Sequence, residues 1–192
     1  HFPANTDNLW KAQFMLKFEE LFYLQLYLVR SFKMRQQVLR GFVFSRIGDY
    51  FNSFYKNIPF ELTGAQKRVL KEIRADVATG KQMNRLLQGD VGSGKTMVAS
   101  LTMLMAIDNG FQACIMAPTE ILATQHYDNL AESFLKVGIN VALLTGSTPK
   151  KRRRQIHEML EDGTLHILIG THALIEPDVK LENLGMVVID EQ

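Results

Sequence analysis

The first residues whose types and spacing could do chemistry form a glycine-rich run: Gly89, Asp90, Val91, Gly92, Ser93, Gly94, Lys95 and Thr96. The run fits the phosphate-binding pattern G-x-x-x-x-G-K-[ST] at every fixed position. Glycines let backbone N–H groups turn inward toward an anion, and a helix that starts there adds a positive partial charge. Lys95 would bind the β- and γ-phosphates of a nucleotide, and the Thr96 hydroxyl would hold Mg²⁺. The alternative is a Gly/Ser turn that happens to precede a lysine.

A pair of carboxylates, Asp190 and Glu191, follows four apolar residues at 186–189. A buried strand that ends in Asp190 can bring this carboxylate to Mg²⁺ beside Thr96. Adjacent strand residues point in different directions, so Glu191 is free to orient or deprotonate an attacking water. The alternative is a strand that ends in an exposed acidic turn. Together with the phosphate loop, the pair predicts a nucleoside triphosphate, Mg²⁺ and attack of water on the γ-phosphate. The predicted catalytic residues are Lys95, Asp190 and Glu191, and the predicted metal ligands are Thr96 and Asp190.

Short apolar strands alternate with amphipathic helices after Pro59. The pattern predicts strands at 84–88, 112–117, 140–144, 166–170 and 186–190. It predicts helices at 64–77, 97–107 and 119–137, and a further helix from beyond 149 to about 162. Such alternation is typical of an α/β fold with a parallel sheet covered by helices on both faces.

Polar segments fall where these strands end. Besides the phosphate loop and the carboxylate pair, they are Pro118-Thr119-Glu120, Thr145-Gly146-Ser147 and Gly170-Thr171-His172. Ligands of open parallel sheets bind at the carboxyl ends of the strands. We therefore expect all these segments to lie at one edge of the sheet.

The N-terminal part, residues 5–40, predicts one long helix with Thr6 or Asp7 as its cap. Its apolar side chains go nearly all the way round between residues 14 and 29, which predicts burial on more than one side, between domains. Asp49 is expected to cap a short helix before Pro59. We expect residues 1–57 to be a helical linker and residues 58–192 a nucleotide-binding domain.

Composition limits the other possibilities. The net charge of +2 requires any nucleic-acid binding to come from local patches. The single cysteine, Cys114, excludes an intrachain disulfide, fits a reducing compartment and lies in a strand pattern that predicts a packed thiol. We find no signal peptide and expect no membrane span. The ends, His1 and Gln192, predict a piece cut from a longer protein.

The order of these motifs resembles that of superfamily-2 helicases and translocases, and is most similar to the RecG family of bacterial branched-DNA helicases. The resemblance rests on the phosphate loop and on residues 117–123, 170–175 and 189–192. It implies a RecA-like P-loop NTPase motor domain that uses ATP and Mg²⁺ to remodel branched DNA, at stalled forks and recombination junctions, as a monomer in the bacterial cytoplasm. It also implies a wedge domain before residue 1 and a second motor domain, with an arginine finger, after residue 192.

Carried over by position, the resemblance assigns the adenine edge to Gln66, supported by Phe60 or Thr63. It assigns contacts with the DNA phosphate backbone to Pro118, Thr119, Glu120, Thr145, Gly146, Ser147, Thr171 and His172. Lys150 opens a run of five cations beside this track, for which DNA binding and a solvated helix start weigh equally.

Two alternatives stay open at this point. The motor of the transcription-repair coupling translocase looks similar, although Ser93, Glu120 and Gln192 favour RecG. The chain could also be a non-catalytic nucleotide- or DNA-binding module, because an arginine finger contributes about 10³–10⁵ in rate and none is expected here.

Overall fold

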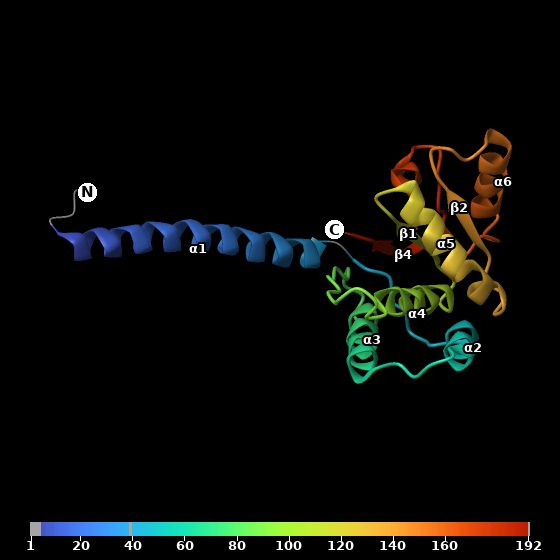
Figure 1. The fold of residues 1–192 in the computed structure, drawn as a ribbon, viewed down its shortest axis with the longest axis horizontal. Helices are drawn as coiled ribbons and strands as arrows, with labels where there is room; N and C mark the ends of the chain where they lie inside the picture. Colours follow the sequence, from blue (N-terminus) through green and yellow to red (C-terminus); the bar gives the residue numbers. More distant parts are fainter. Residues whose placement is uncertain (1–4, 39, 192) are drawn as a thin grey trace.

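The computed structural model describes residues 5–38 and 40–191 of the chain. Helix α1 (Thr6–Val38) projects away from the remaining elements, which pack together around one sheet (Figure 1). The Asn5 side chain caps α1, because its Oδ1 accepts a hydrogen bond from the N–H of Asn8 at 2.8 Å. The predicted caps Thr6 and Asp7 instead lie inside the first turn.

The sheet contains β1 (Gln112–Met116), β2 (Val141–Leu144), β3 (Ile167–Gly170) and β4 (Leu184–Ile189). Its strand order is β2-β3-β1-β4, and every pair is parallel. Parallel neighbours need a crossover connection, and the helices between the strands provide it. The predicted fold class, a RecA-like domain preceded by a long helix, is confirmed.

Helices cover both faces of the sheet, as the sequence predicts. Ala113 and Ile115 of β1 pack in one apolar cluster with α4 (Lys95–Ile107) and α5 (Glu120–Leu135). Cys114, between them, packs on the opposite face in a cluster with α6 (Lys150–Glu161) and the short helix η1 (His172–Ile175). This alternation follows from the two-residue period of a strand. Burial raises the pKa of the Cys114 thiol to about 11, in agreement with the prediction of a packed thiol.

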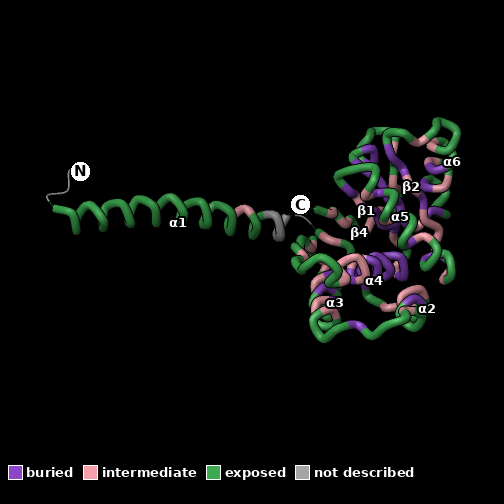
Figure 2. The backbone as a smooth tube through the Cα atoms, viewed as in Figure 1, coloured by how far each residue is buried: buried purple, intermediate pink, exposed green. Residues whose placement is uncertain are grey.

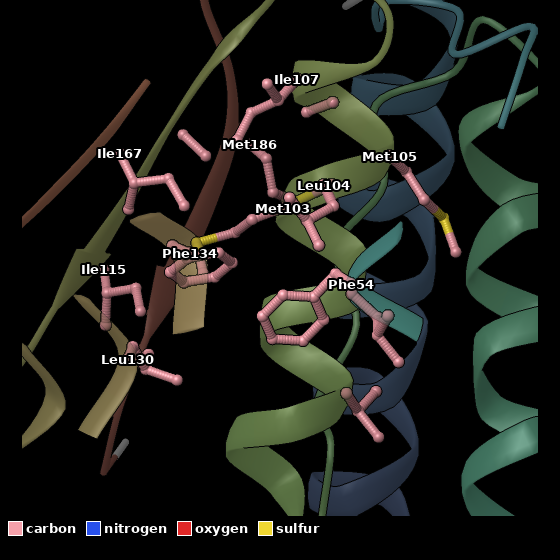
Figure 3. Packing of buried hydrophobic residues seen from close by; sticks show 14 of the residues in the cluster. Phe54, Met103, Leu104, Met105, Ile107, Ile115, Leu130, Phe134, Ile167 and Met186 are labelled. Atoms are coloured by element: carbon pink, nitrogen blue, oxygen red, sulfur yellow. The ribbon is translucent and has the colours of Figure 1, made fainter. Parts of the chain in front are cut away.

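Helix α4 is the centre of the core. It contacts β1 and β4 on one side, and α2 (Asp49–Asn57) and α3 (Gly64–Val77) on the other. Figure 2 shows its second half almost wholly buried, and Figure 3 shows Met103 and Leu104 among the apolar side chains of this cluster, with Phe134 of α5 and Phe54 of α2 nearby. The phosphate loop therefore leads into a helix that is fixed on every side.

The predicted strand at 84–88 is absent from the described structure, where residues 82–90 form an irregular segment. Only one of its two leucines packs inward: Leu87 joins the large core cluster, whereas Leu86 is 70% exposed. The sheet ends at β4, so the segment has no paired neighbour among the described strands. An apolar pattern alone does not make a strand without a hydrogen-bonding partner.

The apolar side chains of α1 are exposed, including Trp10 at 72% and Leu21 at 65% (Figure 2). Phe18 stacks on Phe14 and Phe22, one turn to either side. The burial predicted for α1 is thus not achieved against the other described elements. None of the described helices combines the length and the apolar character needed to cross a membrane.

A buried carboxylate fixes the segment before Pro59 to the sheet domain. Asp108, at the end of α4, is only 4% exposed. Its carboxylate accepts hydrogen bonds from the N–H groups of Gly48, Tyr50 and Phe51, at 2.8, 3.1 and 3.2 Å. Asp108 therefore caps α2 from a distant part of the chain. The prediction that Asp49 is the cap was wrong, because Gly48 holds the N-cap position without a side-chain hydrogen bond.

We predict that Asp108→Ala lowers the free energy of unfolding by about 2 kcal/mol, because three part-buried N–H groups lose their acceptor. Asp49→Ala should cost well under half as much, since Asp49 is exposed and contributes only through the helix dipole. Chemical denaturation of the two variants measures this difference. Equal losses would mean that the Asp108 contacts do not stabilise α2.

Candidate nucleotide and nucleic-acid site

The four strands end in one line. Gly170 lies opposite Leu144 on one side and Met116 on the other, and Met116 lies opposite Ile189. Two further hydrogen bonds continue this edge, from the Ala117 N–H to the Gly170 carbonyl at 2.8 Å and from the Asp190 N–H to the Met116 carbonyl at 2.9 Å. The expectation of one shared edge is confirmed for the segments that follow β1, β2, β3 and β4, whereas the phosphate loop does not follow a strand of this sheet.

The phosphate loop turns into α4 at Gly94, whose φ of 80° places it in the left-handed region that favours glycine. A Cβ there would also collide with Nε2 of Gln66. Lys95 folds over the loop and donates from Nζ to the carbonyls of Gly89 at 2.8 Å and Asp90 at 2.9 Å. Val91 and Gly92 at its tip are exposed. The loop thus gathers a cation and a helix N-terminus, as the sequence predicts.

Gln66 connects this loop to α3. It forms a capping box with Thr63, in which Thr63 Oγ1 accepts from the Gln66 N–H at 3.2 Å and Gln66 Oε1 accepts from the Thr63 N–H at 2.8 Å. Its Nε2 donates to the Ser93 carbonyl at 2.8 Å. Phe60 is 53% exposed beside this helix start. Thr63, Gln66 and the loop are therefore brought together, and their contact with adenine stays a prediction.

The carboxylate pair follows β4, as predicted. Oδ2 of Asp190 lies 2.7 Å from Nε2 of His126 on α5. An ionised carboxylate only accepts hydrogen bonds, so Nε2 carries the proton. Glu191 has a φ of 52°, in the left-handed region. A residue other than glycine in this region stores backbone strain, which is typical of functional positions.

The oxygen donors at this edge fit Mg²⁺. His126 contacts Oδ2 of Asp190 and leaves Oδ1 for another partner. Within the described residues no group of three or more His, Cys, Asp or Glu side chains could hold a metal alone. Mg²⁺ commonly takes one or two protein oxygens together with water and nucleotide phosphates, which matches the Thr96 hydroxyl and the Asp190 carboxylate.

Glu120 fixes the loop that follows β2. Thr119 caps α5, with its Oγ1 accepting from the Leu122 N–H at 3.3 Å, and thereby places Glu120 in the first turn. The Glu120 carboxylate accepts from the Ser147 hydroxyl at 2.7 Å and from the Ser147 N–H at 3.1 Å. These two hydrogen bonds, the hydroxyl first, lower the pKa of Glu120. The carboxylate is therefore held as an anion that supports the loop.

The other residues assigned to DNA divide into buried and exposed ones. Thr145 and Thr171 are 4% and 3% exposed, so a contact with DNA at these positions would come from the main chain. The exposed ones are Pro118, Gly146, Lys150 and His172. In the cation run, Arg153 pairs with Glu176 and donates to the Thr145 carbonyl at 3.0 Å. Arg153 therefore supports the loop that follows β2. Lys150 and Lys151, at the start of the cation run, are exposed.

Sequence reasoning did not find His126 or the role of Arg153. Their partners lie far along the chain, so no local spacing connects them. The sequence offered one hint for His126, which is that it lies in the helix directly after a predicted strand end. Gln192, on which the resemblance to RecG partly rests, and His1 lie outside the described residues.

Comparison with known proteins supplies a family. The chain matches the DEAD/DEAH box helicase family over residues 63–192, more than half of its length. The chain belongs to this family. The matched region contains the phosphate loop, the carboxylate pair and all the strand-end segments.

Curated relatives carry the name ATP-dependent DNA helicase RecG. Those of Synechocystis sp. and Thermotoga maritima are both 49% identical over 193 residues, and the matches cover all of this chain but 23% and 24% of the relatives. The chain thus spans about a quarter of their length. The solved structure of RecG bound to a three-way DNA junction superposes with a TM-score of 0.88 at 49% identity, covering 100% of this chain and 26% of that one. The helicase MrfA shares the fold, with a TM-score of 0.59 at 23% identity over 77% of this chain.

We predict that Ser147→Ala raises the pKa of Glu120 toward its ordinary value, because the largest stabilising hydrogen bond of the carboxylate is lost. The folded-state pKa lies below the unfolded one, so this pair stabilises the fold above the unfolded pKa and less as pH falls through the folded pKa. The free energy of unfolding of this variant should therefore fall less steeply than that of the wild type as the pH is lowered through the acid range. Carboxyl carbon NMR during a pH titration measures the pKa.

Thr164→Ala is the matched control, since the Thr164 hydroxyl lowers the pKa of Asp162 in the same way at a different turn. That variant should raise the pKa of Asp162 and leave Glu120 unchanged. An unchanged Glu120 pKa in Ser147→Ala would contradict the contact.

Proposed function

We propose that the chain is a motor segment of an ATP-dependent DNA helicase of the RecG type, which couples Mg-ATP hydrolysis to the remodelling of branched DNA. In this proposal residues 58–192 belong to the first RecA-like motor domain and residues 1–57 to a helical linker. The observation that carries it is the shared edge of the sheet. The carboxylate pair and the Glu120-supported loop lie at the carboxyl ends of the same parallel strands, and the phosphate loop leads into α4, which packs against β1 and β4.

The nucleotide site would combine the phosphate loop, which contacts Gln66, with the carboxylates that follow β4. Lys95 would exchange its two loop carbonyls for the phosphates of ATP, with the N–H groups of the loop from Gly89 to Thr96 around them. Thr96 and Asp190 would hold Mg²⁺, which neutralises developing phosphate charge when bound. Glu191 would orient or deprotonate the attacking water. Gln66, with Thr63 and Phe60, would lie on the adenine side.

The DNA site would lie along the other strand ends. The exposed Gly146 and the N-terminus of α5 would offer backbone N–H groups, which can bind phosphates without reading sequence, whereas the Ser147 hydroxyl and N–H already donate to Glu120. Lys150 and His172 are exposed beside them. Glu120 would act by holding Ser147 in place, since a carboxylate itself repels phosphate. Preference for branched DNA rests on the relatives and on the junction-bound RecG structure.

The full-length protein would add a wedge domain and a second motor domain. This part of the proposal rests on the relatives, which are about four times as long as the chain. An arginine finger from the second motor domain would complete the ATP site, and the protein would act as a monomer. The transcription-repair coupling translocase is the alternative whole-protein assignment, and it predicts no preference for branched over linear duplex.

The test is ATP hydrolysis by the full-length protein with forked DNA, linear duplex or no DNA. We predict that forked DNA stimulates hydrolysis more than linear duplex of equal length. Glu191→Gln should lower kcat about 10²–10⁴-fold with nucleotide affinity retained, because it removes the base. Lys95→Ala should lower nucleotide affinity as well.

Lys136→Ala is the matched control for loss of a lysine, because Lys136 is exposed at the far end of α5. It should leave hydrolysis unchanged. Absence of DNA stimulation in the wild-type protein would contradict the proposed function, and equal stimulation by linear and forked DNA would favour the translocase alternative.

A further inference from the structure

His126 makes the one side-chain hydrogen bond to Asp190 that the described residues show. Its Nε2 lies 2.7 Å from Oδ2 of Asp190, and the two side chains are 16% and 33% exposed. The contact joins α5 to the end of β4, and the two residues are 64 positions apart in the sequence. Neither the family match nor the resemblance to RecG assigns a role to this histidine.

The helix holds the imidazole firmly. Ala123 lies three residues before His126 and Leu130 four residues after it, so all three share one helical face. Ala123 is 0% and Leu130 5% exposed, and both pack in the large core cluster. This face of α5 is therefore anchored against the sheet, and the backbone that carries His126 cannot shift without disturbing the core.

We propose that His126 is a positioning residue for Asp190. Its Nε2–H holds Oδ2 and so fixes the orientation of the carboxylate, with Oδ1 as the oxygen that would bind a divalent cation. Groups that hold a metal-ligating carboxylate in place commonly change metal affinity 10- to 100-fold when they are removed. The proposal deepens the proposed ATP site and rests on it.

The same helix gives this contact a second consequence. Glu120, at the first position of α5, holds Ser147, and His126 lies less than two turns further along. The carboxylate proposed for the cation and the loop proposed for DNA are thus supported by one rigid helix.

The test measures the affinity of the full-length protein for a fluorescent ADP analogue as the Mg²⁺ concentration is varied. We expect His126→Ala to raise the half-saturating Mg²⁺ concentration about 10-fold or more. Without Mg²⁺, the affinity of this variant for the ADP analogue should stay within about 2-fold of the wild-type value, because His126 would act only through the cation ligand.

Two amide variants separate positioning from general polarity. His126→Gln places an N–H near the position of Nε2 and should restore the wild-type Mg²⁺ dependence, whereas the shorter His126→Asn should behave like His126→Ala. Asp128→Asn, an exposed change on the same helix, is the control and should have no effect. Circular dichroism measures whether each variant is folded. If His126→Ala does not fold, the comparison of His126→Gln with His126→Asn still tests the role of His126.

Equal Mg²⁺ dependence in the wild-type, Gln and Asn proteins would overturn the role of His126. That result differs from failure of the ATP site itself, which would show as unchanged nucleotide affinity in Lys95→Ala.

Discussion

Met116 pairs with Gly170 on one side and Ile189 on the other, and Gly170 pairs in turn with Leu144. This parallel register determines where everything else in the site lies. Because the strands end together, the residues that follow them leave the sheet at the same edge. Gly170 has a particular part in this edge, since a Cβ at this position would collide with the Leu144 carbonyl. The close approach of β2 and β3 therefore requires glycine at the point where the loop after β3 begins.

Burial holds this edge rigid from behind. Helix α4 has the sheet on one side and α2 and α3 on the other, so the phosphate loop leads into a helix that is held between them. Asp108 closes the other end of α4 by capping α2, and Gln66 ties α3 to the Ser93 carbonyl. Helix α5 is fixed by Ala123, Leu130 and Phe134 in the same core. The loops that carry the chemistry are irregular, but each is joined at one end at least to a helix or strand of the core.

The sequence was sufficient for whatever depends on local pattern. The phosphate loop, the Thr63 and Thr119 helix starts, the four parallel strands and the acidic end of β4 all come from spacing, capping and apolar period. The sequence was insufficient where two hydrogen-bonded residues lie far apart along the chain. Nothing near residue 49 shows that Asp108 caps α2, and nothing near residue 126 shows that His126 reaches Asp190. The segment 84–88 has a strand-like composition and lacks a strand beside it, and the apolar surface of α1 predicts a burial that the other described elements do not provide.

In the proposed function, one edge of the sheet serves both nucleotide and DNA. Hydrogen–deuterium exchange of the full-length protein, with a non-hydrolysable ATP analogue, Mg²⁺ and forked DNA added separately and together, tests it most directly. We predict that the nucleotide slows exchange of amides in residues 89–96 and that DNA slows exchange in residues 145–148 and 171–172. Protection of these strand-end loops by neither ligand, with protection elsewhere in the protein, would contradict it.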